Sequence, residues 1–231
     1  MVLKLVILDL DQTLIYSLKR FYKLFNRSLV EYGVKPVSWE KFIEYYRSDS
    51  LDKLIPSSVS PRVFWRSFRR KYSSEPVHSE DYVIPGARET LRYLKERGLK
   101  VVIATGREVD RDTLWRELEH FGLKEYVDEV YSIIHQNPED EEIDFLKTGL
   151  LLRIIRDFNV KPCEAVFVAD YWVDMESCRR AGLICIAVKT GYESEGKLKR
   201  HGAILVIDSI RDLPKAIEEI ERGGRYSACK R

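Results

Sequence analysis

Short, uninterrupted apolar runs recur along this chain, and segments with the length and periodicity of amphipathic helices separate them. The runs cover residues 5–10, 100–105, 165–170, 183–188 and 203–207, and residues 127–134, which include Asp128 and Glu129, form a further predicted strand. An apolar run without polar alternation predicts a strand that is buried on both faces. Strands that alternate with helices form a parallel sheet, because each helix carries the chain back to the start of the next strand. The pattern therefore predicts an α/β fold with helices on both faces of a parallel sheet.

The segment that follows the first run differs in composition from the rest. From Tyr16 to Ile84 it carries 13 Lys and Arg against 8 Asp and Glu, so its net charge is +5 in a chain of +2, and it holds 14 of the 26 aromatic residues. Its apolar residues recur at helical spacing in three stretches that begin near Phe21, Trp39 and Pro61. We therefore expect a Rossmann-like core domain at 1–14 and 85–223, an all-helical domain inserted after the first strand at 15–84, and a disordered tail at 224–231.

No part of the 231-residue chain approaches the roughly 20 consecutive apolar residues that cross a bilayer. The apolar start is short and contains Asp9, so it is not expected to act as a signal peptide or a membrane anchor. The cytoplasm is therefore the expected compartment. Four cysteines show neither C-x-x-C spacing nor histidines at zinc-ligand spacing, so we expect them to be reduced, buried apolar residues.

Polar residues that could act in catalysis or ligand binding stand at the ends of the predicted strands. Alternate residues of a strand point the same way, so the carboxylates of Asp9 and Asp11 are expected on one side of the first strand's end. Two like charges beside an apolar run are costly unless a cation or a reaction uses them. Other strand and helix ends carry a hydroxyl, a cation and two carboxylates: Thr105, Lys147, Asp170 and Asp174. Each alone has an ordinary structural explanation, but together they mark the sheet edge where ligands bind.

These residues resemble the motifs of the haloacid dehalogenase superfamily of phosphohydrolases. The matching segments are DLDQT (9–13), ATG (104–106), Lys147 and AD-x-x-x-D (169–174), and the resemblance extends through 83–107 and 160–191. The helical insert resembles that family's helical cap domain, and the phosphoglycolate-phosphatase-like group is nearest in layout. Dehalogenases of the superfamily lack the second aspartate, so Asp11 favours phosphate chemistry.

The resemblance implies a magnesium-dependent phosphatase that acts on a small phosphate ester. Asp9 would attack phosphorus, and Asp11 would exchange protons with the leaving group and the attacking water. The implied phosphate-binding residues are Thr105, Gly106, Arg107 and Lys147, of which Thr105 and Lys147 also stabilise the transition state. The implied Mg²⁺ ligands are Asp9, the backbone carbonyl of Asp11, and Asp170, with Asp174 holding a metal-bound water or the Lys147 ammonium.

Three departures from the family pattern are present. Gln12 stands where the family usually has a small residue, and Ala169 stands where it usually has glycine. The family's lysine-proline turn is replaced by HQNPEDEEIDFLK (135–147), so Lys147 is assigned by its position at a helix start.

Other functions share parts of this pattern. A phosphotransferase or mutase uses the same aspartates, and the sequence does not separate it from a hydrolase. Nucleic-acid binding through the basic insert is disfavoured, because the sequence pI is only about 8.2 and most of the aromatic residues have core spacing. A non-catalytic relative is disfavoured by the intact aspartates.

The substrate stays open among phosphoglycolate, a sugar phosphate and a nucleotide, and a promiscuous role is open as well. We expect the insert to set specificity, and the protein to be a monomer or weak homodimer without membrane or nucleic-acid partners. The insert offers several cations that could contact a second anionic group or simply face solvent: Arg47, Lys53, Arg62 and Arg66.

Overall fold

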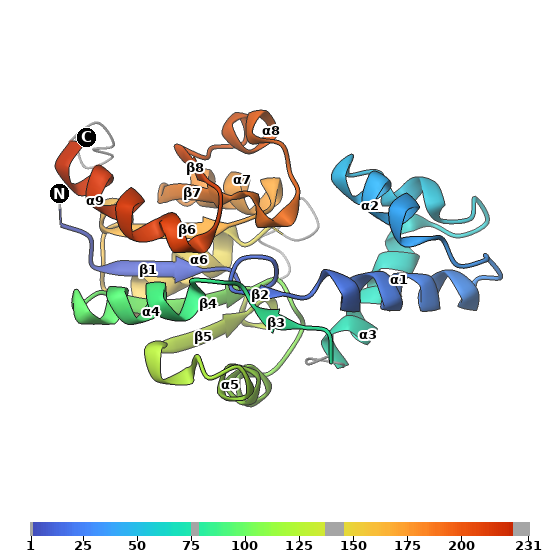
Figure 1. The fold of residues 1–231 in the computed structure, drawn as a ribbon, viewed down its shortest axis with the longest axis horizontal. Helices are drawn as coiled ribbons and strands as arrows, with labels where there is room; N and C mark the ends of the chain where they lie inside the picture. Colours follow the sequence, from blue (N-terminus) through green and yellow to red (C-terminus); the bar gives the residue numbers. More distant parts are fainter. Residues whose placement is uncertain (1, 75–78, 137–145, 224–231) are drawn as a thin grey trace.

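The computed structural model describes residues 2–74, 79–136 and 146–223; the predicted tail and the acidic run at 139–144 lie outside this range. Six parallel strands form one sheet in the order β5-β4-β1-β6-β7-β8 (Figure 1). The strands are β1 (Leu5–Leu8), β4 (Lys100–Thr105), β5 (Glu129–Ser132), β6 (Ala165–Ala169), β7 (Ile184–Val188) and β8 (Leu205–Ile207). Each lies within a predicted strand, and the predicted α/β fold is confirmed.

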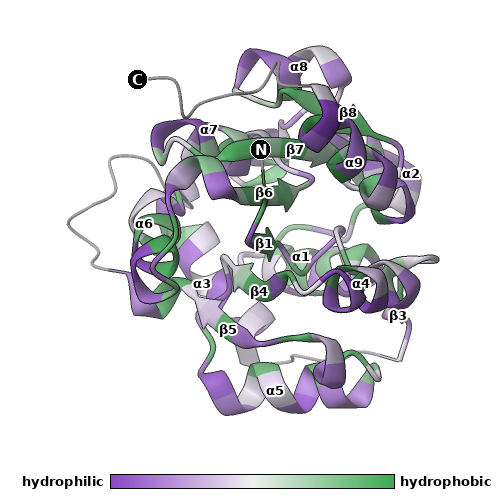
Figure 2. Ribbon diagram, turned by 90° about the vertical axis from the view of Figure 1, so that its left-hand side faces the viewer, coloured by the Kyte–Doolittle hydropathy of each residue, from purple (hydrophilic) through white to green (hydrophobic). Residues whose placement is uncertain are grey.

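Each face of the sheet packs against its own set of helices. One face carries α4 (Ala87–Glu96), α5 (Arg111–His120) and α9 (Leu213–Gly223), and the other carries α6 (Thr148–Asp157), α7 (Trp172–Arg180) and α8 (Glu195–Arg200). Within β1, Val6 and Leu8 contact the first set, whereas Leu5 and Ile7 contact the second. Figure 2 shows the hydrophobic strands enclosed by helices with hydrophilic outer surfaces. No described helix is long and apolar enough to span a bilayer.

Three helices form a separate layer beyond the end of β1 (Figure 1), and we call residues 15–84 the cap. They are α1 (Leu18–Glu31), α2 (Trp39–Arg47) and α3 (Pro61–Ser74), with a short 3-10 turn at Leu51–Leu54. Phe25, Phe42 and Phe64 are fully buried at their centre, and the ring of Phe25 lies 5.8 Å and 5.4 Å from the other two. The cap therefore has a hydrophobic cluster of its own, built from the aromatic residues at helical spacing.

The cap joins the core through two short antiparallel strands that the sequence did not predict. β2 (Ile15–Tyr16) leaves the core, and β3 (Tyr82–Val83) returns to it. The rings of Tyr16 and Tyr82 stack with centroids 4.9 Å apart. Both chain connections between cap and core pass through this strand pair.

The cysteines in the described ranges are buried as predicted, but the prediction that they are reduced was wrong. Cys178 on α7 and Cys185 on β7 form a disulfide, with their Cα atoms 5.8 Å apart. No cysteine in the described ranges is a free thiol. The pairing arises because α7 packs across the neighbouring strand, and a separation of seven residues matches no motif that could have revealed it.

We expect replacement of both Cys178 and Cys185 by alanine to lower the free energy of unfolding by about 2–3 kcal/mol, because the bond closes a short loop in the unfolded chain. For a chain of this length this corresponds to a Tm decrease on the order of 5–10 °C. Calorimetry of the oxidised wild type and the double variant measures the difference. An unchanged Tm would show that the bond does not constrain the unfolded chain.

Candidate active site

Three neighbouring strands end at the same edge of the sheet. β1 lies between β4 and β6, and Leu8 pairs with Ile103 and Val168. Asp9 follows Leu8 directly, and its backbone N–H donates to the Val168 carbonyl at 2.9 Å. Thr105 and Asp170 come two residues after the partners of Leu8. Sheet register therefore brings residues from opposite ends of the chain to one edge, as the sequence pattern indicated.

Lys147 links two of the aspartates at this edge. It stands at the start of α6, and its backbone N–H donates to Ser177 Oγ on α7 at 2.8 Å. Its ammonium donates to Asp9 Oδ1 at 2.5 Å and to Asp174 Oδ2 at 3.1 Å. Helix packing thus places the lysine where the helix-start assignment expected it, beside the predicted nucleophile.

Negative charge exceeds positive charge in this group. Asp9, Asp170, Asp174 and Lys147 are each no more than 5% exposed. Burial raises the pKa of Asp9 to about 7, against the opposing charge of Lys147. Burial also raises the pKa of Asp170 well above its ordinary value, and the negative charges of Asp9 and Asp174 add to the effect. Burial alone would lower the pKa of Lys147, but Asp174 and Asp9 raise it instead. The group thus holds three buried carboxyl groups and one cation, which pairs with Asp9 and Asp174.

This charge excess fits a divalent cation. The donors are hard carboxylate oxygens, which Mg²⁺ prefers. Among the described residues, no three or more Asp, Glu, His or Cys side chains are grouped as ligands of one ion. The expected site needs only Asp9 and Asp170 as side-chain ligands, because a backbone carbonyl and waters fill the other positions. Asp174 instead pairs with Lys147, which is one of the two partners expected for it.

Asp11 points into a different environment from Asp9. Arg107 binds it in a bidentate manner, with Nε donating to Oδ2 at 2.6 Å and Nη2 donating to Oδ1 at 2.5 Å. Ser17, Arg20 and Tyr72, all from the cap, donate to the same Oδ1 at 2.5, 3.2 and 2.8 Å. Burial alone would raise the pKa of Asp11, but Arg107 and Arg20 hold it well below its ordinary value. Asp11 is therefore firmly ionised and attached to the cap.

Two buried acids complete this network at the junction of cap and core. Arg107 also donates to Glu117 Oε2 on α5 at 2.6 Å, and Arg20 lies 3.2 Å from Asp81 beside β3. The side chains of Arg20, Asp81 and Glu117 are fully buried. The sequence interpretation missed Arg20 and placed Arg107 on the substrate phosphate. In the structure both arginines bind Asp11 instead. We call the following five residues the Asp11 network: Asp11, Arg20, Asp81, Arg107 and Glu117.

Thr105 and Gly106 lie on the Lys147 side of the site. Thr105 is almost fully buried, and its hydroxyl oxygen accepts from the backbone N–H of Arg107 at 3.2 Å. A Cβ at Gly106 would lie 3.4 Å from Lys147 Cε, in ordinary van der Waals contact, so Gly106 lies beside the lysine side chain. Of the four predicted phosphate-binding residues, Thr105, Gly106 and Lys147 are therefore close together, and the guanidinium of Arg107 is bound to Asp11.

The two unusual motif residues fit their positions. Gln12 has a left-handed φ of 58°, and its side-chain amide lies 3.0 Å from Ser17 Oγ. With its oxygen turned toward α1, the amide also accepts from the Leu18 N–H at 3.0 Å and so caps that helix. Ala169 is fully buried within the sheet. Gln12 therefore links the first motif to the cap.

A second set of contacts joins cap and core on the far side of the site. Asp49, just after α2, accepts hydrogen bonds from Tyr171 Oη at 3.1 Å, Trp172 Nε1 at 2.9 Å and Lys197 Nζ at 2.9 Å. Tyr171 directly follows Asp170, so the cap contacts the loop that carries an expected metal ligand. We call this contact the Asp49 latch.

Replacing Asp49 with alanine is expected to release the cap from the core without unfolding it. Tyr171, Trp172 and Lys197 are each partly exposed, so water can replace the lost acceptor and we expect a stability loss of only about 1 kcal/mol. Hydrogen exchange at residues 170–173 should become faster. Asp52→Ala is the matched control, because Asp52 accepts a hydrogen bond from Trp65 Nε1 at 2.5 Å, and both residues belong to the cap. Equal exchange at 170–173 in both variants would contradict the latch.

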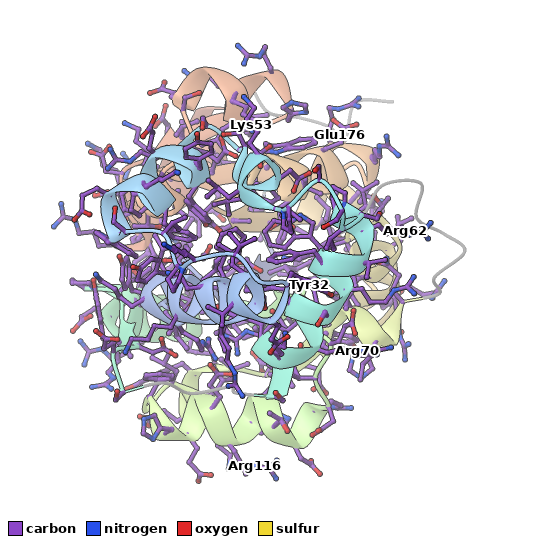
Figure 3. All side chains as sticks on the ribbon, turned by 90° about the vertical axis from the view of Figure 1, so that its right-hand side faces the viewer. Tyr32, Lys53, Arg62, Arg70, Arg116 and Glu176 are labelled. Atoms are coloured by element: carbon purple, nitrogen blue, oxygen red, sulfur yellow. A yellow bond between two sulfur atoms is a disulfide. The ribbon has the colours of Figure 1, made fainter. Side chains whose placement is uncertain are left out.

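The four cap cations that the sequence offered as contacts for a second anionic group, Arg47, Lys53, Arg62 and Arg66, do not lie together. Lys53, Arg62 and Arg66 are exposed, and Figure 3 shows Lys53 and Arg62 on the cap side of the molecule. The Arg47 guanidinium instead lies 4.9 Å from the ring centroid of Tyr192, which belongs to the core. Arg47 is therefore the member of this set at the boundary between cap and core.

Comparison with known proteins identifies the family of this architecture. Residues 6–188 match the family model described as haloacid dehalogenase-like hydrolase. A phosphoglycolate phosphatase of Pseudomonas fluorescens is 24% identical over 224 residues, covering 91% of this chain and 78% of that protein. A phosphoglycolate phosphatase of Synechococcus elongatus is 22% identical, covering 94% and 98%.

Solved structures show the same fold. The crystal structure of a predicted phosphatase from Clostridium acetobutylicum has a TM-score of 0.75 at 22% identity, covering 95% of this chain and all of that one. A putative β-phosphoglucomutase from Thermotoga maritima has a TM-score of 0.63 at 19% identity, covering 94% and 99%. At these identities the likeness concerns the fold alone.

Proposed function

This chain belongs to the haloacid dehalogenase-like hydrolases, and on that premise we propose that it is a magnesium-dependent phosphatase that hydrolyses a small phosphate ester through a phosphoryl-aspartate at Asp9. The observation that carries the proposal is the buried group of Asp9, Asp170, Asp174 and Lys147, in which the one ammonium pairs with Asp9 and Asp174 and three carboxyl groups face a single cation. Buried carboxyl groups that outnumber their structural counterions are typical of a cation site. The phosphatase names of the curated relatives agree with it.

In this mechanism the Asp9 carboxylate attacks phosphorus and the ester oxygen leaves. Bound Mg²⁺ would be held by Asp9 and Asp170 and would supply positive charge beside the phosphoryl oxygens. Lys147 binds Asp9 and can donate to a phosphoryl oxygen from the same position, while the Thr105 hydroxyl donates from the next strand. Asp174 holds the ammonium of Lys147 in place. Water then attacks the phosphoryl group and regenerates Asp9.

Asp11 must change partners to exchange protons with the leaving group. In the structure Arg107 holds it ionised, and an ionised carboxylate cannot donate a proton. Three of its donors belong to the cap, so cap movement alters the environment of Asp11. We therefore place its acid step after the cap has moved and the core residue Arg107 has released the carboxylate. As in other enzymes with lids, this would couple chemistry to closure.

A phosphotransferase is the second candidate, and the fold likeness to a putative β-phosphoglucomutase is the observation behind it. The two functions differ in whether water or a substrate hydroxyl accepts the phosphoryl group from Asp9. The comparison with phosphoglycolate phosphatases favours water.

A panel of phosphate monoesters tests the proposal. Phosphoglycolate, a sugar phosphate, a nucleotide and p-nitrophenyl phosphate are each assayed for phosphate release, with Mg²⁺ and then with excess chelator. We expect release from at least one ester with Mg²⁺ and its loss with chelator. Phosphate release that survives the chelator would contradict a magnesium enzyme, and transfer to an added sugar phosphate without release would favour the phosphotransferase.

A further inference from the structure

The carboxylate of Asp170 lies against a residue that has no side chain. A Cβ atom built on Gly191 would lie 1.7 Å from Asp170 Oδ2, 2.5 Å from its Cγ and 2.7 Å from its Cβ. Contacts below 3.0 Å do not occur between non-bonded atoms of these kinds in folded proteins, so the two side chains exclude each other. Gly191 is the last residue of the 3-10 turn Lys189–Gly191, directly after β7, and it is buried.

Backbone conformation does not explain this glycine. Its φ lies outside the left-handed region that favours glycine, in contrast to Gly182 and Gly202, whose φ values are +73° and +121°. An L-residue could adopt its backbone geometry without strain. The requirement at position 191 is therefore one of space beside Asp170.

The turn that carries Gly191 is fixed to the first motif. The hydroxyl of Thr190 donates a short hydrogen bond to the backbone carbonyl of Gln12, three residues after Asp9. The N–H of Tyr192 donates to the Lys189 carbonyl at 3.1 Å and closes the turn. Gly191 thus cannot move away from Asp170 without disturbing the loop that holds Asp9.

Asp170 has little freedom to yield either. It is 5% exposed, and its own Cβ, which side-chain rotation does not move, lies within the excluded distance. A methyl group at position 191 would therefore displace the backbone at Asp170 or the whole turn. Both changes alter where the Asp170 carboxylate stands relative to Asp9.

We propose that Gly191 is a positioning residue for the metal site: the absence of its side chain lets the Asp170 carboxylate share one divalent cation with Asp9. This inference rests on the proposed magnesium-dependent function. It adds a residue from the end of β7, which carries no ligand of its own and which the sequence motifs do not mark.

Mg²⁺ binding to purified Gly191→Ala, measured by isothermal titration calorimetry without substrate, tests the inference. Displacing a residue that orients a ligand typically weakens metal binding 10–100-fold, and we expect a loss in Mg²⁺ affinity of at least about 10-fold. Gly196→Ala is the matched control. Position 196 lies on α8, where a new Cβ meets nothing closer than 3.8 Å, and its Mg²⁺ affinity should equal that of the wild type. Wild-type affinity in Gly191→Ala would overturn the inference. A wild type that binds no Mg²⁺ would instead overturn the proposed function.

A double-mutant cycle separates the specific clash from general damage to the fold. Without metal, Gly191→Ala should lower the Tm of the wild type but not that of Asp170→Gly, because that background lacks the three atoms that lie nearest to the new Cβ. If Gly191→Ala does not fold, folding of the Asp170→Gly/Gly191→Ala double variant supports the inference. An equal Tm loss in both backgrounds, or failure of the double variant to fold while Asp170→Gly folds, would overturn it.

Discussion

Asp9→Asn is expected to lose at least about 10³-fold in kcat on any phosphate ester that the wild type hydrolyses, because loss of a covalent nucleophile typically has an effect of this size or larger. The amide has nearly the same shape as the carboxylate, but it does not attack phosphorus and is a poor ligand for Mg²⁺. Steady-state rates with p-nitrophenyl phosphate in saturating Mg²⁺ measure the loss. Activity within ten-fold of the wild type would contradict the assignment of Asp9.

The same variant should not lose stability in the metal-free protein. The pKa of Asp9 rises from 3.8 to about 7 in the folded state. Between these values only the folded state holds the proton, so metal-free wild-type protein becomes less stable as pH rises through this window. Asp9→Asn should show a flatter dependence and should be at least as stable above pH 7. Denaturant unfolding with chelator, from about pH 4 to pH 8, measures both curves, and a steeper decline in the variant would contradict the direction.

Arg107→Met is expected to lower the free energy of unfolding by about 3–5 kcal/mol, the usual result of removing one partner from a buried ion pair. The substitution leaves Asp11 and Glu117 sharing only Arg20, whose Nη2 lies 3.2 Å and 3.9 Å from them. Denaturant unfolding with chelator measures the loss, which is a large part of the 5–15 kcal/mol that stabilises a typical protein.

Two further variants show whether this loss comes from the Asp11 network. Arg116→Met, on the exposed side of α5, should change stability by no more than about 0.5 kcal/mol. The double variant Asp11→Asn/Arg107→Met should lose less than the sum of its single variants, because it removes both charges of the pair. Additive losses would show that Arg107 stabilises the protein without acting on Asp11.

The sheet was predictable because burial on both faces leaves a direct signal in the sequence. Strands such as β1 and β6 are apolar at every position, and a parallel sheet then requires that their ends meet. Asp9 and Asp170 could be assigned to one site on that ground. Lys147 could be assigned to the same site because it stands at the start of a predicted helix. All these signals are local to one strand or helix.

Contacts between segments distant in sequence could not be predicted in this way. Arg107 directly follows the ATG motif, which predicted that it binds phosphate. In the structure its guanidinium binds Glu117 and Asp11 instead. Asp49 is one acid among several in the cap until the fold brings Trp172 beside it. The disulfide depends on which helix face covers β7. Each of these three contacts depends on how the side chains of two packed elements point toward each other. The periodicity within one element does not determine that.

Direct detection of a phosphoryl group on Asp9 is the most decisive test of the proposed mechanism. Asp11→Asn should slow the attack of water on the intermediate, so that variant is mixed with Mg²⁺ and an ester that the wild type hydrolyses, quenched in acid within one turnover, and digested for mass spectrometry. We predict one added phosphoryl group on the peptide that contains Asp9, assigned to its carboxylate and absent when chelator is present. A phosphoryl group on another residue, or wild-type turnover of this variant with an unmodified Asp9 at every quench time, would contradict the mechanism.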